Sequence, residues 1–243
     1  MNSLRSHIQD WREMAAADPM RAITAERKQW DMEEFFATAK PHMDELFSVA
    51  ASIGAPQQFD RALDFGCGAG RFARYLSSRF TESWGVDVST EMIDLARRYC
   101  PQCKFHLNTA ADLSIFPDAH FDLIFSFLVL QHLPTQDLIE QYIREFLRIL
   151  KPGGLAAFQV PDHLSLRWRI QPRRRLYGLL RQIGFSPDRL HRWNLLPMRL
   201  TAIPEHRVRS IVFVSGGEVR HRDCSGMYYC VKCIKHGAIS ISS

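Results

Sequence analysis

The sequence predicts an α/β fold with a mostly parallel sheet, and three observations support this prediction. Short apolar runs alternate with helical patterns from residue 61 to about residue 160. The longest apolar stretch, residues 123–130 (LIFSFLVL), is far shorter than the roughly 18 residues of a membrane span. The composition, with 46% hydrophobic and 23% charged residues in a chain of 243, is that of an ordinary globular protein. Alternating strands and helices favour right-handed crossovers and a parallel sheet covered on both faces.

The N-terminal region, residues 1–58, is expected to form a helical cap. Its apolar residues recur with the spacing of one helix face, first from Met32 to Ala39 and then, after Pro41, from Met43 to Ala50. The first residues are too polar for the core of a signal peptide. We therefore expect a soluble, cytoplasmic protein.

The central region, residues 59–160, carries the alternating pattern. Strands are expected at residues 62–66, 83–87, 104–108, 121–127 and 155–160. Helices are expected between them at about residues 70–79, 90–99 and 135–150, and residues 151–154 (KPGG) supply the residues that end the last of these helices.

The C-terminal part breaks this rhythm and then completes the sheet. Residues 161–203 are rich in arginine and proline, and we interpret them as an insertion over the carboxyl edge of the sheet. In residues 204–243 we expect a helix at 205–214 and a hairpin formed by residues 217–223 and 227–233. The hairpin would close the sheet with an antiparallel edge.

Charge is concentrated in one segment. Residues 161–209 hold eleven arginines, no lysine and three acids, which gives +8 in a chain whose formal net charge is +5. The rest of the chain therefore carries −3. Such a segment indicates an anionic partner on one face, or else a solvated arginine surface.

The six cysteines do not form a disulfide framework in a chain of this size. Two pairs, Cys100 with Cys103 and Cys230 with Cys233, have the C-x-x-C spacing of zinc ligands. The second pair lies inside an expected strand, where residues three apart face opposite sides. We therefore expect no metal site.

Residues 64–70 (DFGCGAG) give the strongest chemical signal, because they stand where a strand ends and a helix begins. Glycines there let a ligand approach the backbone, and the helix N-terminus offers free N–H groups to an anion. The stretch from Gly68 to Ala73 also fits a dinucleotide fingerprint. Asp64, however, would repel a pyrophosphate and suits a ligand with an ammonium group. S-adenosylmethionine has that ammonium group, a carboxylate and no phosphate.

The core resembles the class I S-adenosylmethionine-dependent methyltransferases of the small, metal-independent kind, similar to methyltransferase type 11, over roughly residues 58–160. The matching motifs are residues 63–72 (LDFGCGAGRF), 84–87 (WGVD), 108–113 (NTAADL), 121–134 (FDLIFSFLVLQHLP) and 150–158 (LKPGGLAAF). The resemblance implies a Rossmann-like, seven-stranded, mostly parallel sheet with an antiparallel last strand.

The resemblance also implies a cofactor site. Asp87 would hold both ribose hydroxyls, the following residues would pack beside the adenine, and the fourth strand would lie beneath the methionine part. Met92 has the alternative role of helix core, and Thr109 stands where the family usually has an acid or an amide. The residues so assigned are Asp64, Gly66, Cys67, Gly68, Gly70, Asp87, Val88, Met92, Thr109, Ala110, Ser126 and Phe127.

His132 is the candidate catalytic residue. It follows the fourth strand, where acceptor groups enter in this family, and a general base assists an oxygen nucleophile that must lose a proton. The alternative is that His132 caps or packs against the next helix.

Motifs that are absent after the fourth strand exclude several classes of methyl acceptor. Residues 126–129 (SFLV) differ from the Asp/Asn-Pro-Pro-aromatic motif of nucleic-acid amine methylation, no cysteine nucleophile is near, and no acid between Asp122 and Asp137 suits a magnesium site. We expect methyl transfer to an O or N atom of a small molecule that is acidic or carrier-linked. The alternatives are an RNA methyltransferase that uses residues 161–209, and a non-catalytic cofactor-binding interaction protein. Because that segment has no lysine, RNA ranks second, and a membrane surface is also less favoured.

Overall fold

The computed structural model describes residues 2–24 and 30–233. Its strands form one seven-stranded sheet in the order β3-β2-β1-β4-β5-β7-β6. Strands β1 to β5 pair in parallel, whereas β7 is antiparallel to both β5 and β6. The strands are β1 (Arg61–Phe65), β2 (Glu82–Asp87), β3 (Lys104–Leu107), β4 (Phe121–Ser126), β5 (Leu150–Gln159), β6 (Gly217–Arg222) and β7 (Met227–Lys232). The predicted mostly parallel sheet with an antiparallel last strand is confirmed.

Several helices begin after residues whose side chains satisfy free backbone N–H groups. Asp31 accepts from Glu33 and Glu34, Ser89 from Met92, and Thr135 from Leu138. The helical elements are α1 (Asn2–Ala17), α2 (Pro19–Thr24), α3 (Met32–Ala37), α4 (Ala39–Ile53), α5 (Arg71–Leu76), α6 (Thr90–Tyr99), the 3-10 turn η1 (Leu130–His132), α7 (Gln136–Ile149), α8 (Leu166–Ile170), α9 (Pro172–Gln182), α10 (Pro187–Arg192) and α11 (Glu205–Val214).

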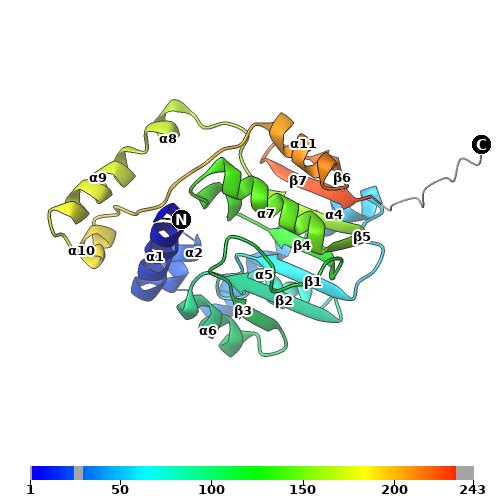
Figure 1. The fold of residues 1–243 in the computed structure, drawn as a ribbon. Coiled ribbons are helices and arrows are strands. Elements are labelled where there is room, and N and C mark those ends of the chain that lie inside the picture. Colours follow the sequence, from blue (N-terminus) through cyan, green and yellow to red (C-terminus); the bar gives the residue numbers. More distant parts are fainter. Residues whose placement is uncertain (1, 25–29, 234–243) are drawn as a thin grey trace, which may run out of the picture.

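Successive strand residues point to opposite sides of the sheet, and in the central strands β1 and β4 both sets are buried because helices pack against each face. On one face, Leu63 and Phe65 of β1 belong to a core formed with α7 and α11. On the other face, Ala62 packs with α4 and α5. Figure 1 shows this layering, with α7 and α11 on one side of the sheet and α4 and α5 on the other. Burial on two sides explains the almost continuous apolar character of β4.

The fifth strand is longer than expected. We expected it to begin at residue 155, but β5 begins at Leu150, immediately after α7. Pairing with β4 shifts between Phe121, which faces Leu150, and Leu123, which faces Leu155. Gly154 lies in this bulge, where an added Cβ would be 2.9 Å from the Asp122 carbonyl oxygen. The KPGG residues therefore end the helix as predicted and also form an irregular start of the strand.

The arginine-rich insertion forms an arm made of α8, α9 and α10, for which the sequence pattern gave no helices. Figure 1 shows the arm at the same end of the molecule as α1 and α2, away from the β6–β7 hairpin. Helix α10 contacts α1 as well as α9. No helix among residues 2–24 and 30–233 is both long and apolar enough to cross a membrane.

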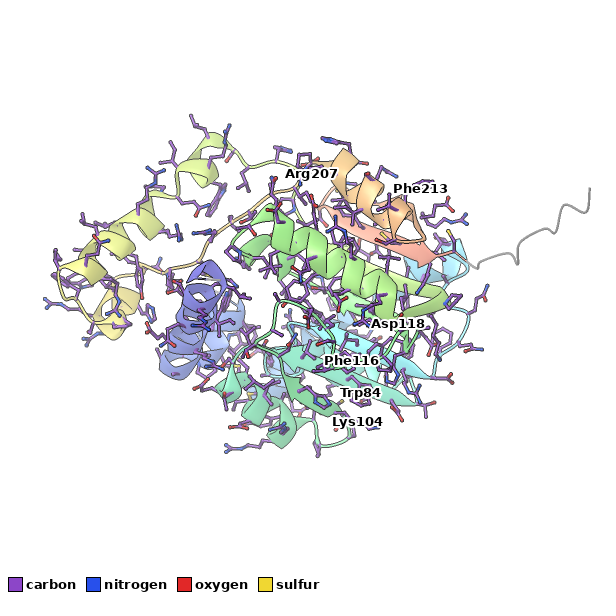
Figure 2. The ribbon with its side chains drawn as sticks, viewed as in Figure 1. Trp84, Lys104, Phe116, Asp118, Arg207 and Phe213 are labelled. Carbon is purple, nitrogen blue, oxygen red and sulfur yellow. The ribbon has the colours of Figure 1, made fainter. Side chains whose placement is uncertain are left out.

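The edge of the sheet near β2 and β3 is packed with aromatic side chains. Figure 2 shows Trp84, Phe116 and Lys104 gathered there. The Trp84 and Phe116 rings meet edge to face with centroids 5.8 Å apart, and the Lys104 ammonium lies 4.6 Å from the Trp84 ring. This edge lies away from the arm and supports the sheet.

Candidate active site

A cavity of about 620 Å³ lies where β1, β2 and β4 end at their carboxyl edge. Its volume is within the usual range of small-molecule sites, and its position is where open α/β sheets bind ligands. One half of its wall, the strand-end half, comes from the loops that follow β1, β2, β3 and β4. The other half, the arm half, comes from α1, α2 and residues 168–200 of the arm and the chain after it.

The glycine loop after β1 forms the floor of the strand-end half. Gly66, Gly68 and Gly70 all have positive φ, at +77°, +51° and +87°. A Cβ on Gly66 would also stand 2.3 Å from Cγ2 of Val129. The backbone N–H groups of Gly66 and Cys67 both donate to the Val86 carbonyl oxygen, at 2.8 and 3.0 Å. Glycine is required at Gly66 both by the backbone conformation and by the close approach of Val129.

Asp64 lies beneath this loop and does not line the cavity. Its side chain is 1% exposed, and Oδ2 accepts the Ala73 N–H of α5 at 3.0 Å. Burial raises the pKa of Asp64 to about 7, and the bond from Ala73 opposes that increase only in part. Asp64 therefore ties the first turn of α5 to the end of β1.

Asp87, at the end of β2, does line the cavity. Its Oδ2 accepts the Gly68 N–H at 2.9 Å and its Oδ1 accepts the Ser89 N–H at 3.0 Å. Burial raises the pKa of Asp87, whereas these N–H groups favour the ionised form. Each carboxylate oxygen has a further acceptor position, so Asp87 can also accept hydrogen bonds from a ligand.

The loop after β3 contributes Asn108 to the cavity wall. Thr109 and Ala110, which the sequence singled out, are exposed and do not line the cavity. Asn108 Oδ1 accepts the Ala110 N–H at 3.2 Å, and its Nδ2 donates to the Asp112 carbonyl oxygen at 2.9 Å. Asn108 thus holds the loop in shape and presents its side chain to the cavity.

The region after β4 contributes Phe127, while Ser126 lies one position deeper. Ser126 is fully buried, and its Oγ has no hydrogen-bond partner among the described residues. It faces the interior at the end of β4, and only its neighbour Phe127 lines the cavity.

His132 also lines the cavity, and its ring is held by three neighbours. Nδ1 lies 2.8 Å from the Arg199 carbonyl oxygen, so this nitrogen carries the proton and donates it. Nε2 lies 3.3 Å from Nε2 of Gln131, and Trp11 meets the ring edge to face at 5.4 Å. Burial lowers the pKa of His132, which keeps the ring neutral at pH 7.

The arm half contains a second histidine, His7 of α1. Burial, with smaller contributions from His132, Arg199 and Arg174, lowers the pKa of His7 to about 4. Sequence reasoning missed His7 and Trp11, although a helical spacing from Leu4 through Trp11 to Ala15 was present as a signal. Arg173 and Arg174 of α9 complete the polar lining of this half.

The predicted residues divide into two groups. Those that line the cavity are Gly66, Cys67, Gly68, Asp87, Val88, Met92, Phe127 and His132. Those that lie outside the lining are Asp64, Gly70, Thr109, Ala110 and Ser126. Gly70 packs toward α6 and β3, where an added Cβ would be 3.1 Å from Cys100 Sγ.

The two C-x-x-C pairs are separated by their surroundings. Cys100 and Cys103 are buried against α5, where their thiols donate to the Gly70 and Ala73 carbonyl oxygens. Cys230 is buried inside β7, and Cys233 is exposed. Within residues 2–24 and 30–233, no group of three metal-binding side chains gathers.

Sequence comparisons find that the core is similar to methyltransferases. Residues 63–158 match the family described as "Methyltransferase domain". A trans-aconitate 2-methyltransferase of Azoarcus sp. (strain BH72) is 36% identical over 138 residues, which are 54% of this chain and 51% of that protein. A malonyl-[acyl-carrier protein] O-methyltransferase of Enterobacter lignolyticus (strain SCF1) is 36% identical over 104 residues, 42% of this chain and 39% of that protein. The chain spans about half or less of the length of the curated relatives it matches.

A solved structure matches the fold over almost the whole chain. Magnesium protoporphyrin IX methyltransferase from Synechocystis PCC 6803 with bound SAH superposes with a TM-score of 0.62. The match covers 94% of this chain and 99% of that chain at 16% sequence identity. At this identity the likeness establishes the Rossmann-like fold.

Proposed function

We propose that this chain, whose core is a methyltransferase domain of the class I S-adenosylmethionine-dependent family, transfers a methyl group to an O or N atom of a small acidic or carrier-linked molecule. One observation carries the proposal: a single cavity has Asp87, the glycine loop and His132 in its strand-end half, and His7 with Arg173 and Arg174 in its arm half. The first half suits the cofactor, and the second suits an anionic acceptor.

The residues of the strand-end half fit S-adenosylmethionine. Asp87 would accept hydrogen bonds from both ribose hydroxyls, and Val88, Met92 and Asn108 would surround the adenine. The backbone of Gly66 to Gly68 would approach the methionine part closely. We assign Asp64 a positioning role, because it is sealed beneath the loop and holds α5.

Bound S-adenosylmethionine would supply a methyl group on a positively charged sulfur. The lone pair of the acceptor would attack the methyl carbon in line, and the sulfur would leave as the neutral thioether. The chain's own task is then to align the acceptor and to exclude water. Trp11 and Leu196 line the arm half beside His7, and their apolar side chains support water exclusion.

The need for a base depends on the acceptor atom. A carboxylate is already ionised at pH 7, so it can attack without losing a proton, whereas a hydroxyl has to lose one. His132 has Nδ1 committed to the Arg199 carbonyl oxygen, which leaves Nε2 as the nitrogen able to accept a proton. We propose His132 as the base for a hydroxyl or an ammonium acceptor, and as a wall residue for a carboxylate.

The arginines support a small anionic acceptor over RNA. Arg173 and Arg174 line the cavity, where they can reach a ligand held beside the cofactor. The names of two relatives, trans-aconitate 2-methyltransferase and malonyl-[acyl-carrier protein] O-methyltransferase, both refer to acids, which agrees with this choice.

The test is methyl transfer from radiolabelled S-adenosylmethionine by the full chain. The acceptors are a panel of mono-, di- and tricarboxylic acids, an acyl-carrier thioester of a dicarboxylic acid, and transfer RNA. We expect labelling of an acidic small molecule or carrier thioester, and its loss in Asp87→Ala. Labelling of RNA alone, or cofactor binding without transfer to any acceptor, would contradict the proposal.

A further inference from the structure

A second cavity of about 480 Å³ lies beside the first one. It is bounded by α8 and α9 on one side and by the loop before α7 and the chain at residues 199–202 on the other. Gln171, Arg174 and Leu200 line both cavities, so the two share a wall. The remaining lining residues are Pro134, Gln136, Leu164, Arg169, Ile170, Arg175, Arg199, Thr201 and Ala202.

The charge on this wall is of one sign. Four arginines line the second cavity, namely Arg169, Arg174, Arg175 and Arg199, and no aspartate or glutamate is among its lining residues. Arg174 is half-buried, and its pKa is lowered by burial and then by the nearby charge of Arg199. The charge of Asp10 on α1 raises the pKa of Arg174, and this effect is the smallest of the three. Two guanidinium groups are therefore held within each other's field, which an oxyanion between them would relieve.

The wall that carries Arg199 is fixed by hydrogen bonds. Thr201 donates its N–H to the Gln131 carbonyl oxygen at 2.7 Å and its hydroxyl to that of Leu133 at 2.6 Å. Arg199 itself donates Nη1 to the Pro134 carbonyl oxygen at 2.6 Å, and Gln171 donates to that of Leu200 at 2.8 Å. This wall is thus formed before any ligand arrives, which lowers the entropic cost of binding.

Other arginines of the arm have different surroundings. Arg181 donates to the Phe185 carbonyl oxygen, and Arg189 lies over the Phe185 and Trp193 rings. These side chains pack within the arm. The arginine cluster of residues 173–175 is therefore divided among environments: Arg173 lines the first cavity, Arg175 the second, and Arg174 both.

We propose that the second cavity binds a further anionic group of the methyl acceptor, a phosphate or a second carboxylate, while the reacting atom lies in the first cavity. This inference rests on the proposed function and specifies its substrate class. The acceptor has two anionic or polar ends, and Arg174 contacts it between them. A carboxylate is planar and a phosphate is tetrahedral, but each presents a pair of oxygens that the two N–H groups of a guanidinium can bind together.

The experiment is calorimetric titration of inorganic phosphate, and separately of citrate, into the full chain saturated with S-adenosylhomocysteine. The test variant combines Arg169→Gln and Arg175→Gln, which lie on the second cavity alone and have exposed side chains. The matched control is Arg98→Gln, an exposed arginine on α6 that lines neither cavity.

We expect the double variant to weaken binding of phosphate, citrate or both at least tenfold. The control should change that binding less than twofold, and neither variant should change S-adenosylhomocysteine affinity. If only phosphate binding is weakened, the second cavity binds a phosphate group of the acceptor. If only citrate binding is weakened, it binds a carboxylate. Equal binding by the double variant and the unaltered chain, an equal loss in Arg98→Gln, or no binding of either anion would overturn the proposal.

Methyl-transfer assays separate this inference from the proposed function. If the double variant raises the acceptor KM and leaves kcat unchanged, both stand. If anion binding depends on Arg169 and Arg175 while no acceptor is methylated, the anion site stands and the proposed function fails. If methyl transfer occurs with an unaltered KM in the double variant, the function stands and the inference fails.

Discussion

The strand-end half and the arm half of the first cavity differ in which parts of the chain form them. The strand-end half follows consecutive elements of the sheet, and its key groups are backbone amides of the glycine loop and the Asp87 carboxylate. The arm half joins α1, near the start of the chain, to residues 168–200. Under the proposed function, cofactor binding depends on local strand-end geometry, whereas acceptor binding depends on side chains brought together only by the tertiary fold. The four predictions below test this difference in order of decreasing effect.

The largest effect is expected from Asp64→Asn, measured as a function of pH. The pKa of Asp64 is raised from 3.8 to about 7 in the folded chain, so the folded state binds the proton more tightly than the unfolded state. The free energy of unfolding should therefore fall, relative to the variant, as pH rises from about 4 to about 7. Its full size is on the order of 4 kcal/mol at about 1.4 kcal/mol per pKa unit.

The measurement is urea denaturation of the cofactor-free protein at several pH values. The quantity to compare is the difference in the free energy of unfolding between the unaltered chain and Asp64→Asn. The pKa of His7 is lowered to about 4, so His7 contributes with the opposite sign, but it does so in both proteins and cancels in the difference. A difference that does not vary with pH would mean that the Asp64 carboxyl is not sealed beneath the loop.

Gly66→Ala should destabilise the strand-end half by about 3 kcal/mol. Overpacking of the new Cβ against a side chain costs roughly 1–3 kcal/mol. Holding an alanine at the positive φ of this position costs roughly 1–2 kcal/mol more. The contact is with Cγ2 of Val129, at 2.3 Å. Thermal denaturation of Gly66→Ala and of the double variant Gly66→Ala/Val129→Ala checks this. The second change should recover the steric part of the loss, and failure to recover any stability would argue against the close approach.

Asp87→Ala should weaken S-adenosylhomocysteine binding by about 2 kcal/mol, or roughly thirtyfold, because hydrogen bonds to a charged group are lost. The variant also loses the bonds that Asp87 accepts from Gly68 and Ser89. Calorimetry provides the measurement, and Arg173→Gln in the arm half is the control that should leave this affinity unchanged. Unaltered affinity in Asp87→Ala would remove Asp87 from the cofactor site.

The smallest effect is expected in backbone hydrogen exchange at the cap. The sequence predicts a helical cap in residues 1–58, and the structure distinguishes two parts of this cap. Ala22 and Ile23 line the cavity, whereas Phe35 and Phe36 are buried in a core with α5 and α6. Residues 25–29 lie outside the described part of the chain. On adding S-adenosylhomocysteine, amides of α2 should gain protection and those of α3 should not; equal gains in both would contradict this division.

The strand-end half was predictable because its signals are local in sequence. An acid that follows an apolar strand, as at Asp87, lies at the carboxyl edge of a parallel sheet wherever the sheet forms. The same reasoning could not decide which side of the backbone each residue faces in the loops. Asn108 therefore lines the cavity instead of Thr109 and Ala110, because its side chain binds the Ala110 N–H and turns the loop outward.

The arm half was not predictable because its contacts join distant segments. His132 Nδ1 donates to the Arg199 carbonyl oxygen across 67 positions of sequence, and Trp11 packs on the same ring from α1. Nothing in the pattern of residues 161–203 indicates that Arg173 and Arg175 would face different cavities. The basic charge of this segment was visible in the sequence, but its division between two sites depends on the turn from α8 into α9.

The most direct test of the two-part cavity is a crystal structure of the full chain with S-adenosylhomocysteine. We predict that the ribose hydroxyls lie within hydrogen-bond distance of Asp87, with the adenine beside Met92. The sulfur should face the space between Phe127, His132 and Arg173. A ligand seated in the arm half, or one whose ribose makes no contact with Asp87, would contradict the account.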